Sequence, residues 1–260
     1  MLDVQIRKRL ATGRKSGDSF SLDVSLSCAT RRLVLFGHSG SGKTLTLQSL
    51  AGLVRPDGGY IKIGDDVLYA SEKGIDLPAR ERHLGYVFQD YALFPHLTVR
   101  RNVEFALDKT KRTLFGRPSP AARKSVDDLL ERFEVGHLAE RYPREISGGQ
   151  RQRVALARML AARPGILMFD EPFSALDSYL KSALEQNLLD VFSVVDRTAL
   201  YVSHDIDEAC RLCDRICVMH NGCVEESGTA GELIARPQTL AGMRLMGCKN
   251  TSRARKVSDT

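Results

Sequence analysis

The hydrophobic residues of this chain follow two different patterns. Between residues 20 and 26 they occupy every second position, which predicts a strand with one buried face. Three further stretches are nearly unbroken apolar runs: "RRLVLFG" (31–37), "GILMFDEP" (165–172) and "TALYVSHD" (198–205). Such short runs, bounded by glycine or polar residues, predict strands that are buried on both faces.

Helical spacing occurs between these strands. Residues 43–53 have helical character, and the apolar residues at 126, 129, 130 and 133 lie on one helix face. Turn residues and alternation over 55–69 predict a hairpin, and 83–89 is another strand candidate. Strands that alternate with helices indicate an α/β fold with a mainly parallel sheet.

One segment departs from this alternation. Residues 97–143 predict a helical insertion between two strand-bearing halves. Within it, 109–124 is basic and contains two prolines, which favours a solvated loop. The last ten or so residues are polar and basic, and we expect them to be disordered.

Composition narrows the class of protein only slightly. The 260 residues include 38 Lys and Arg against 32 Asp and Glu, a net charge of +6, and 43% are hydrophobic. This mild excess permits contact with anionic lipid or nucleic acid but favours neither. Charges interrupt the N-terminus, and no stretch is apolar enough to span a membrane. We therefore expect a cytoplasmic chain whose link to any membrane runs through a partner.

Four of the six cysteines lie close together at 210, 213, 217 and 223. Their spacing suggests a metal site. However, the segment also predicts a helix ending near Asp214, a strand that contains Cys217, and a turn at Asn221-Gly222. Free cysteine behaves as a small buried hydrophobe, and we favour that interpretation.

The motif "GHSGSGKT" (37–44) fits G-x-x-x-x-G-K-[ST], with a predicted strand before it and a helix after it. Its glycines allow backbone N–H groups to turn toward phosphate oxygens. Lys43 is expected to reach the β- and γ-phosphates, and the Thr44 hydroxyl to ligate Mg²⁺.

Two carboxylates follow the apolar run at 166–169. Asp170 and Glu171 come at the carboxyl end of this strand, where α/β sheets bind ligands. Asp170 is expected to hold Mg²⁺ through water, and Glu171 to orient the attacking water or accept its proton. Without the phosphate loop, this pair would be read equally well as an ordinary strand end.

The stretch "ISGGQRQR" (146–153) shortly precedes "ILMFDEP", and together they resemble the ATP-binding-cassette (ABC) family, whose signature is LSGGQ. Ile146 replaces the leading Leu. Other elements of the family follow in order: Gln89 resembles the Q-loop glutamine, "SALD" ending in Asp177 the D-loop, and His204 the switch histidine. The resemblance covers roughly residues 1–235.

The resemblance implies an α/β fold of the P-loop NTPase ABC type, with a mainly parallel core sheet, an antiparallel β subdomain and a helical insertion subdomain. It implies an ATPase domain over 1–235, with a helical signature subdomain at about 97–160, and a C-terminal extension over 236–260. One family feature is missing, because the position of the adenine-stacking aromatic falls near Gly13–Arg14. Arg14 could stack there through its guanidinium, whereas Phe20 is assigned to the sheet.

The resemblance also implies a site shared by two subunits. ATP and Mg²⁺ are the expected ligands, and two ATPase domains pair head to tail as a homodimer, so that each ATP lies between one phosphate loop and the partner's signature. The catalytic residues are Glu171 and His204, and the metal ligands Thr44, Gln89 and Asp170. The nucleotide-binding residues are Gly37, His38, Ser39, Gly40, Ser41, Gly42, Lys43, Thr44, Gln89, Ser147, Gly148, Gly149, Gln150 and Asp177.

The segment after the Q-loop indicates what the ATPase drives. "LFPHLTV" (93–99) is typical of importer-type members, in which this region contacts an integral-membrane permease; its plainer interpretation is a surface loop. The implied location is the cytoplasmic face of the cell membrane, as a peripheral subunit. The permease would in turn work with a periplasmic or lipid-anchored substrate-binding protein, and no nucleic-acid partner is expected.

Residues 66–99 look most like the ATPase subunits of molybdate importers, and "GCKN" (247–250) resembles the start of their oxyanion-binding regulatory domain. We therefore expect molybdate or tungstate import, and 236–260 to be a remnant or the start of that domain. Import of sulfate, iron, polyamine or sugar is the alternative. Different classes are a soluble ABC ATPase acting on nucleic acid or ribosomes, which usually carries two cassettes, and an ATP sensor without turnover, which would lack Glu171.

Overall fold

The computed structural model describes residues 1–11, 19–107, 118–173, 181–182, 185–186, 188–189, 192, 198–245 and 247. The chain divides into two units, one formed by 1–77 with 202–260 and the other by 78–201. Among the described residues, no helix is long and apolar enough to cross a membrane.

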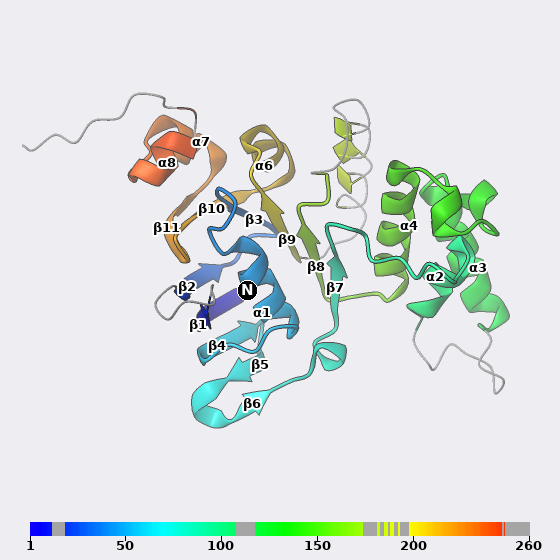
Figure 1. The fold of residues 1–260 in the computed structure, drawn as a ribbon, viewed down its shortest axis with the longest axis horizontal. Coiled ribbons are helices and arrows are strands. Elements are labelled where there is room, and N and C mark those ends of the chain that lie inside the picture. The colour runs from blue at the N-terminus through cyan, green and yellow to red at the C-terminus, as the bar shows by residue number, and fades with distance from the viewer. Residues whose placement is uncertain are drawn as a thin grey trace, which may run out of the picture. The chain divides into compact units, whose positions relative to one another are not determined.

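The first unit is rich in strands (Figure 1). Its strands are β1 (Leu2–Ala11), β2 (Ser19–Cys28), β3 (Arg32–Phe36), β4 (Gly58–Ile63), β5 (Asp66–Ala70), β6 (Ile75–Asp76), β10 (Arg215–His220) and β11 (Cys223–Gly228). Its helices are α1 (Lys43–Ala51), η1 (Ser71–Lys73), α6 (Ile206–Leu212), α7 (Ala230–Ala235) and α8 (Leu240–Leu245). The strands are ordered β6-β5-β4-β1-β2-β11-β10-β3.

The alternating apolar residues of the N-terminal strands place one face of these strands in the core of the unit. β1 and β2 are antiparallel, with Val4 opposite Leu26 and Ile6 opposite Val24. These four side chains are buried, whereas Phe20, on the same face, is half-buried. The predicted hairpin at 55–69 is also confirmed, because β4 and β5 pair antiparallel. A one-residue slip would turn all these apolar side chains outward, so the pattern fixes the register.

The apolar run before the phosphate motif forms the parallel part of the first unit. β3 pairs in parallel with β10, with Val34 opposite Ile216 and Phe36 opposite Val218. All four side chains are almost fully buried. The motif at 37–44 therefore follows directly on a strand that is buried on both faces, and α1 begins at Lys43, within the motif.

The second unit contains the helical segment (Figure 1). Its elements are η2 (Ala79–Glu81), β7 (Leu84–Val87), α2 (Val99–Phe105), α3 (Pro120–Arg132), η4 (Gly136–Leu138), η5 (Pro143–Glu145), α4 (Gly148–Ala161), β8 (Ile166–Asp170) and the first four residues of β9 (Thr198–Ser203). β7 and β8 are parallel neighbours, as expected for the buried runs.

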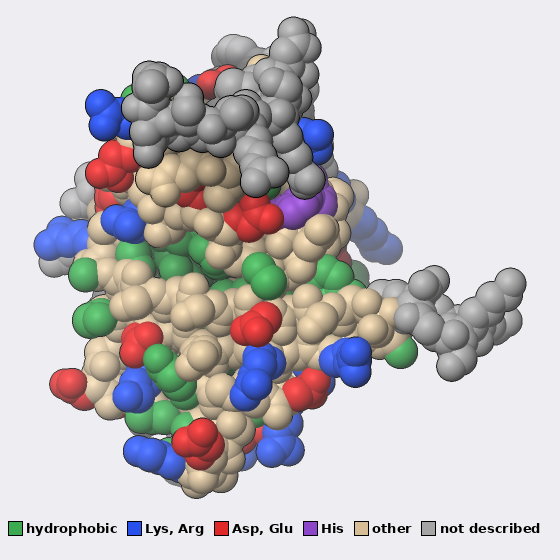
Figure 2. Space-filling model, turned by 90° about the vertical axis from the view of Figure 1, so that its left-hand side faces the viewer, with side chains coloured by type: hydrophobic (Ala, Val, Ile, Leu, Met, Phe, Trp, Pro, Cys, Tyr) green, Lys and Arg blue, Asp and Glu red, His purple; other side chains and the backbone are tan. Residues whose placement is uncertain are grey.

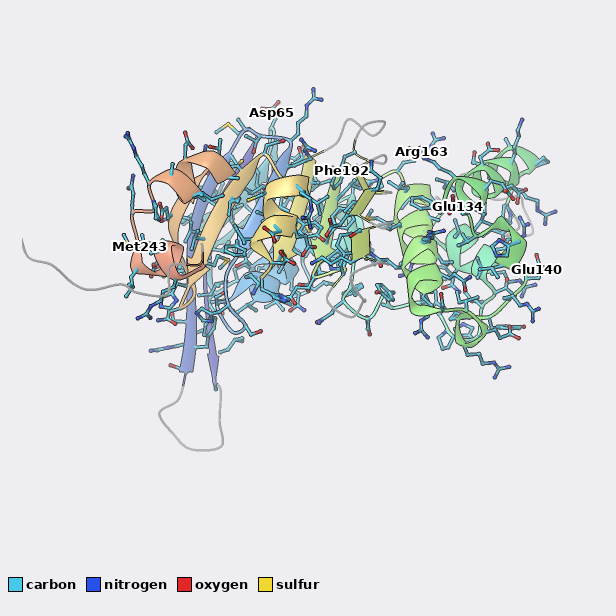
Figure 3. All side chains as sticks on the ribbon, turned by 90° about the horizontal axis from the view of Figure 1, so that it is seen from above. Asp65, Glu134, Glu140, Arg163, Phe192 and Met243 are labelled. Carbon is cyan, nitrogen blue, oxygen red and sulfur yellow. The ribbon has the colours of Figure 1, made fainter. Side chains whose placement is uncertain are left out.

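Helix α4 is the centre of the helical part. It packs against α2, α3 and β7, and its buried side chains include Val154, Leu156 and Met159. On its exposed side, Arg153 donates to Glu134 over 2.7 Å, and Glu134 lies beside α4 in Figure 3. Arg100 of α2 pairs with Asp127 of α3 and with Glu140, so charged side chains connect the outer helices.

One local prediction is wrong. The predicted loop 109–124 includes the start of α3, because Ser119 caps the helix by accepting from the Ala122 N–H and Pro120 occupies the first helical position. The part at 109–117 lies outside the described residues. The segment with the four neighbouring cysteines agrees with its prediction, because α6 ends at Leu212 and Cys217 is buried in β10.

Both signs of charge are interspersed on the face drawn in Figure 2, which agrees with the small net charge of the sequence.

The β10–β11 turn requires glycine at position 222. Gly222 has φ +83°, and a Cβ there would lie 2.0 Å from the Ser21 carbonyl oxygen. We expect Gly222→Ala to lower the free energy of unfolding by about 1–3 kcal/mol, since a left-handed, crowded backbone penalises a side chain.

Urea unfolding provides the measurement. Gly231→Ala is the matched control, because Gly231 lies in α7 with open space around its Cβ position. Alanine is the better helix former, so the control should be unchanged or slightly more stable. Equal stability of both variants would contradict the tight turn.

Candidate nucleotide-binding site

The phosphate motif forms the turn between β3 and α1. Gly40 and Gly42 have φ values of +81° and +101°, a region that glycine enters without strain. Gly42 also approaches β2 so closely that a Cβ would lie 2.8 Å from a methyl carbon of Leu22. The predicted loop geometry is therefore present, and its glycines are required by conformation and packing.

Lys43 lies almost buried within this loop, with 4% of its surface exposed. Its ammonium donates to the carbonyl oxygens of Gly37, over 2.8 Å, and His38, over 3.0 Å. A buried ammonium needs such acceptors, because desolvation penalises its charge. The loop thus concentrates a positive charge at the point where the motif predicts phosphate oxygens.

The β10–β11 turn supports the loop from the side. The Gly222 N–H donates to the Ser41 carbonyl over 3.0 Å, and the Asp23 N–H donates to the Gly222 carbonyl over 2.8 Å. The His38 Nε2 and His220 Nδ1 atoms lie 3.0 Å apart. His38 Nδ1 lies 2.7 Å from the Ser39 carbonyl oxygen, which only accepts, so Nδ1 donates in that contact.

Ser41 adds a sign that the loop is shaped for a ligand. Its side chain is fully buried, and its hydroxyl oxygen has no hydrogen-bond partner among the described residues. Leaving a buried polar group unpaired typically costs about 1–3 kcal/mol. A buried polar group without a partner calls for an explanation, and a ligand bound in the loop would supply one.

His204 follows β9 and is exposed, so it is not a buried core histidine. Its neighbours fix its position. Asp205 caps α6 by accepting from the Asp207 and Glu208 N–H groups, and the Ser203 hydroxyl donates to Glu208 over 2.8 Å. The backbone on both sides of the imidazole is thereby anchored.

In the second unit, Asp170 is the last residue of β8, and Glu171 follows it. Every residue of this strand is buried, and Asp170 is 6% exposed at its end. Asp170 accepts a hydrogen bond from the Tyr86 hydroxyl over 2.9 Å. Glu171 has φ +44°, a conformation that is strained for a residue with a side chain and that is found most often at functional sites.

Gln89 follows β7 and is exposed at the start of a tight turn. Two consecutive non-glycine residues of this turn, Tyr91 and Ala92, have φ +63° and +41°. Arg158 of α4 holds both, donating to their carbonyls over 2.8 Å and 2.7 Å. Its guanidinium also lies over the Phe94 ring, 5.6 Å from the centroid. The helix that follows the signature therefore clamps the turn that carries Gln89.

The signature begins helix α4. Ser147 is the N-cap: its hydroxyl accepts from the Gln150 N–H over 3.3 Å, and the Gln150 side chain accepts from the Ser147 N–H over 2.9 Å. The first-turn N–H groups of Gly148 and Gly149 have no acceptor within the helix. The helix start is thus prepared for an anion at these two amides.

The predicted residues are divided between the two units. The first unit brings together residues 37–44 and also contains His204. The second contains Gln89, Asp170 and Glu171, with the signature residues at 147–150. Asp177, Gly13, Arg14 and the tail from 248 lie outside the described residues. No group of three or more metal-ligating side chains (His, Cys, Asp or Glu) occurs in the part of the chain that the structure describes.

Three contacts were not predicted: those of Tyr86, Arg158 and His220. The contacts of Arg158 could have been suspected from the sequence, since it is a charged residue inside the apolar run "VALARML". Tyr86 offered a weaker indication, because it lies in a predicted strand. Nothing in the sequence indicates the pairing of His38 with His220, as 182 positions separate them.

Comparison with known proteins agrees with this geometry. The model of the family described as "ABC transporter" matches residues 21–174. More than half of the chain is covered, and the chain belongs to the ABC transporter family.

Individual relatives and a solved structure are also similar to this chain. The sulfate/thiosulfate import ATP-binding protein CysA of Caulobacter vibrioides is 44% identical over 80% of this chain and 59% of its own length. The molybdenum import ATP-binding protein ModC of Paramagnetospirillum magneticum is 41% identical over 91% of this chain and 61% of its own length. A dimeric structure of the bacterial ABC transporter cassette MJ0796 is 30% identical, with a TM-score of 0.74, over 88% of this chain and 99% of that one. This chain thus spans about three-fifths of these two relatives' length.

The clamp made by Arg158 yields a prediction. Arg158→Lys keeps the charge but loses the planar fork that reaches two carbonyls at once. We expect the free energy of unfolding to fall by about 1–2 kcal/mol, and amide hydrogen exchange over 89–94 to accelerate.

Mass-spectrometric hydrogen exchange tests this directly. Arg163→Lys is the matched control: this exposed residue follows the same helix, and Figure 3 labels it there. Unchanged exchange over 89–94 in Arg158→Lys would show that the clamp does not hold the turn.

Proposed function

We propose that this chain is the ATP-hydrolysing subunit of an ABC importer, acting as a head-to-tail homodimer on a separate membrane permease. The observation that carries the proposal is the Lys43 ammonium, buried inside a glycine-rich loop that continues into a helix N-terminus. Such a loop suits a polyphosphate, because backbone amides and the lysine converge on one anion. The family match and the importer relatives support the coupling to transport.

In this proposal Lys43 exchanges the Gly37 and His38 carbonyls for β- and γ-phosphate oxygens. The Gly148 and Gly149 amides of one subunit face the γ-phosphate bound by its partner. Ser147 differs from the expectation in one respect, because its hydroxyl already accepts from the Gln150 N–H. That hydroxyl can still donate its own proton to phosphate, so both roles are compatible.

Thr44, Gln89 and Asp170 are proposed to hold Mg²⁺. Their hydroxyl, amide and carboxylate oxygens are the donors that this hard cation prefers. The ion would neutralise charge on the β- and γ-phosphate oxygens. Glu171 is proposed to orient the attacking water, and His204, exposed on an anchored backbone, to contact the γ-phosphate.

The permease is proposed to dock on the second unit. A groove of about 680 Å³ runs along α2 and α3 and is lined in part by Leu97, Arg101 and Phe105. Phe105 is 57% exposed, and its ring centroid lies 4.6 Å from that of Phe94, with the two rings tilted by 57°. A helix of the permease seated here would contact Phe105, which is connected through Phe94 to Arg158, the side chain that clamps the Gln89 turn. Association with a membrane would follow from this contact, on its cytoplasmic face.

The substrate is proposed to be a tetrahedral oxyanion. Sequence resemblance favours molybdate or tungstate, whereas the relatives include several sulfate/thiosulfate importers beside one molybdenum importer. Sulfate is therefore an equal candidate. The exposed aromatic surface favours a protein partner over the nucleic-acid or ribosome-directed class, and Glu171 at its strained position favours turnover over a sensor.

The dimer can be tested with Glu171→Gln. Removing the carboxylate should slow hydrolysis by at least about 100-fold and leave ATP binding intact. ATP should then shift the variant from monomer to dimer in gel filtration with light scattering.

The control is Glu72→Gln, an exposed residue of η1, which should behave as the original protein does. A Glu171→Gln protein that binds ATP but stays monomeric would refute the shared site.

The substrate can be tested by uptake. Membrane vesicles containing the cognate permease, its binding protein and this chain should accumulate labelled molybdate, tungstate or sulfate only with ATP. Lys43→Ala should abolish accumulation.

The three anions are compared at equal concentration. Sulfate uptake without molybdate uptake would overturn the molybdate assignment, and uptake of none of them would overturn the oxyanion class.

A further inference from the structure

Tyr86 contacts the buried carboxylate of the site from a neighbouring strand. β7 and β8 run in parallel, and Tyr86 lies opposite Met168 in their register. Asp170 is two residues beyond Met168, so it lies on the same face of the strand. Tyr86 is thus the diagonal neighbour of Asp170, at a separation that a long aromatic side chain can span.

The contact is a hydrogen bond of defined direction. The Tyr86 hydroxyl oxygen is 2.9 Å from Asp170 Oδ2, and an ionised carboxylate only accepts, so the phenol donates. Burial raises the pKa of Tyr86, and the negative charge of Asp170 raises it further.

Packing fixes the ring that carries this hydroxyl. The Tyr86 and Phe88 rings lie 4.4 Å apart at an angle of 38°. Tyr86 is half-buried, whereas Val87 and Gly85 on the opposite face of the strand are buried. A hydroxyl on a rigid ring is a better anchor than one on a flexible chain, because little side-chain entropy remains to be lost.

We propose that Tyr86 is a positioning residue that orients the Asp170 carboxylate toward the metal ion. A donor on Oδ2 restricts rotation of the carboxylate, so its remaining lone pairs point in a fixed direction. Outer partners of this kind commonly change metal affinity by about 10- to 100-fold when they are removed. This inference rests on the proposed Mg²⁺–ATP site.

Tyr86→Phe removes the hydroxyl and keeps the ring. The full-length protein is titrated with Mn²⁺ in the presence of a non-hydrolysable ATP analogue, and free Mn²⁺ is followed by electron paramagnetic resonance. We expect the half-saturating Mn²⁺ concentration to rise about 10-fold. This readout is independent of hydrolysis, and a role confined to ring packing would leave it unchanged in Tyr86→Phe, because phenylalanine keeps the ring.

Tyr60→Phe is the matched control, because its hydroxyl donates to another carboxylate, Asp3, over 3.3 Å, away from the predicted site residues. It should leave Mn²⁺ binding unchanged. Tyr86→Met keeps apolar bulk without a ring or a hydroxyl, and it should weaken Mn²⁺ binding as Tyr86→Phe does. A shift with Met but none with Phe would assign the effect to ring packing and overturn the proposal.

The outcomes also separate this inference from the proposed function. If the original protein binds no Mn²⁺ with the ATP analogue, the metal site itself is wrong, and the inference falls with it. If the original protein binds Mn²⁺ and Tyr86→Phe binds it equally well or more tightly, the site stands and the role of Tyr86 is refuted.

Discussion

The structure depends on keeping one ammonium group charged inside a loop of the protein. Lys43 is 4% exposed, and its stabilisation comes from two carbonyl oxygens of its own loop. These carbonyls are in place only because glycine permits the turn and because β3, locked by β10, fixes where the turn begins. The hairpin β10–β11 then supports the loop through Gly222 and His220. Each of these features helps to hold a positive charge at the loop where the motif predicts phosphate oxygens.

A second constraint acts within the other unit, where strained backbone is held by long-range contacts. Glu171, Tyr91 and Ala92 all have positive φ without being glycine, and such conformations persist only when their surroundings impose them. Arg158 imposes the turn at Tyr91 and Ala92, and the same guanidinium touches Phe94. One side chain of the signature helix α4 therefore contacts both the turn that follows Gln89 and the Phe94 ring.

Much of the fold could be predicted, because each prediction rested on local periodicity. Alternating residues gave β2, and apolar runs gave β3, β8 and β9, since burial of a strand depends mainly on its own side chains. The phosphate loop and the capped signature helix were equally accessible, because their residues are contiguous. The start of α3 is not predicted, since the prolines of 109–124 favour a loop, although Pro120 after the Ser119 cap begins the helix. For the site, the sequence indicated the residue types, but it did not indicate which neighbours hold them.

The sequence by itself determined the candidate groups: an ammonium, a hydroxyl, two carboxylates and an imidazole, in motifs that fit phosphoryl transfer. The tertiary structure decided how these groups are restrained. It brought His220 to His38 across 182 positions and placed the Tyr86 hydroxyl on Asp170. The reason is physical: a motif specifies side chains along one backbone, whereas hydrogen-bond partners between strands follow from register and packing. Those are properties of the folded chain as a whole, and no short stretch of sequence contains them.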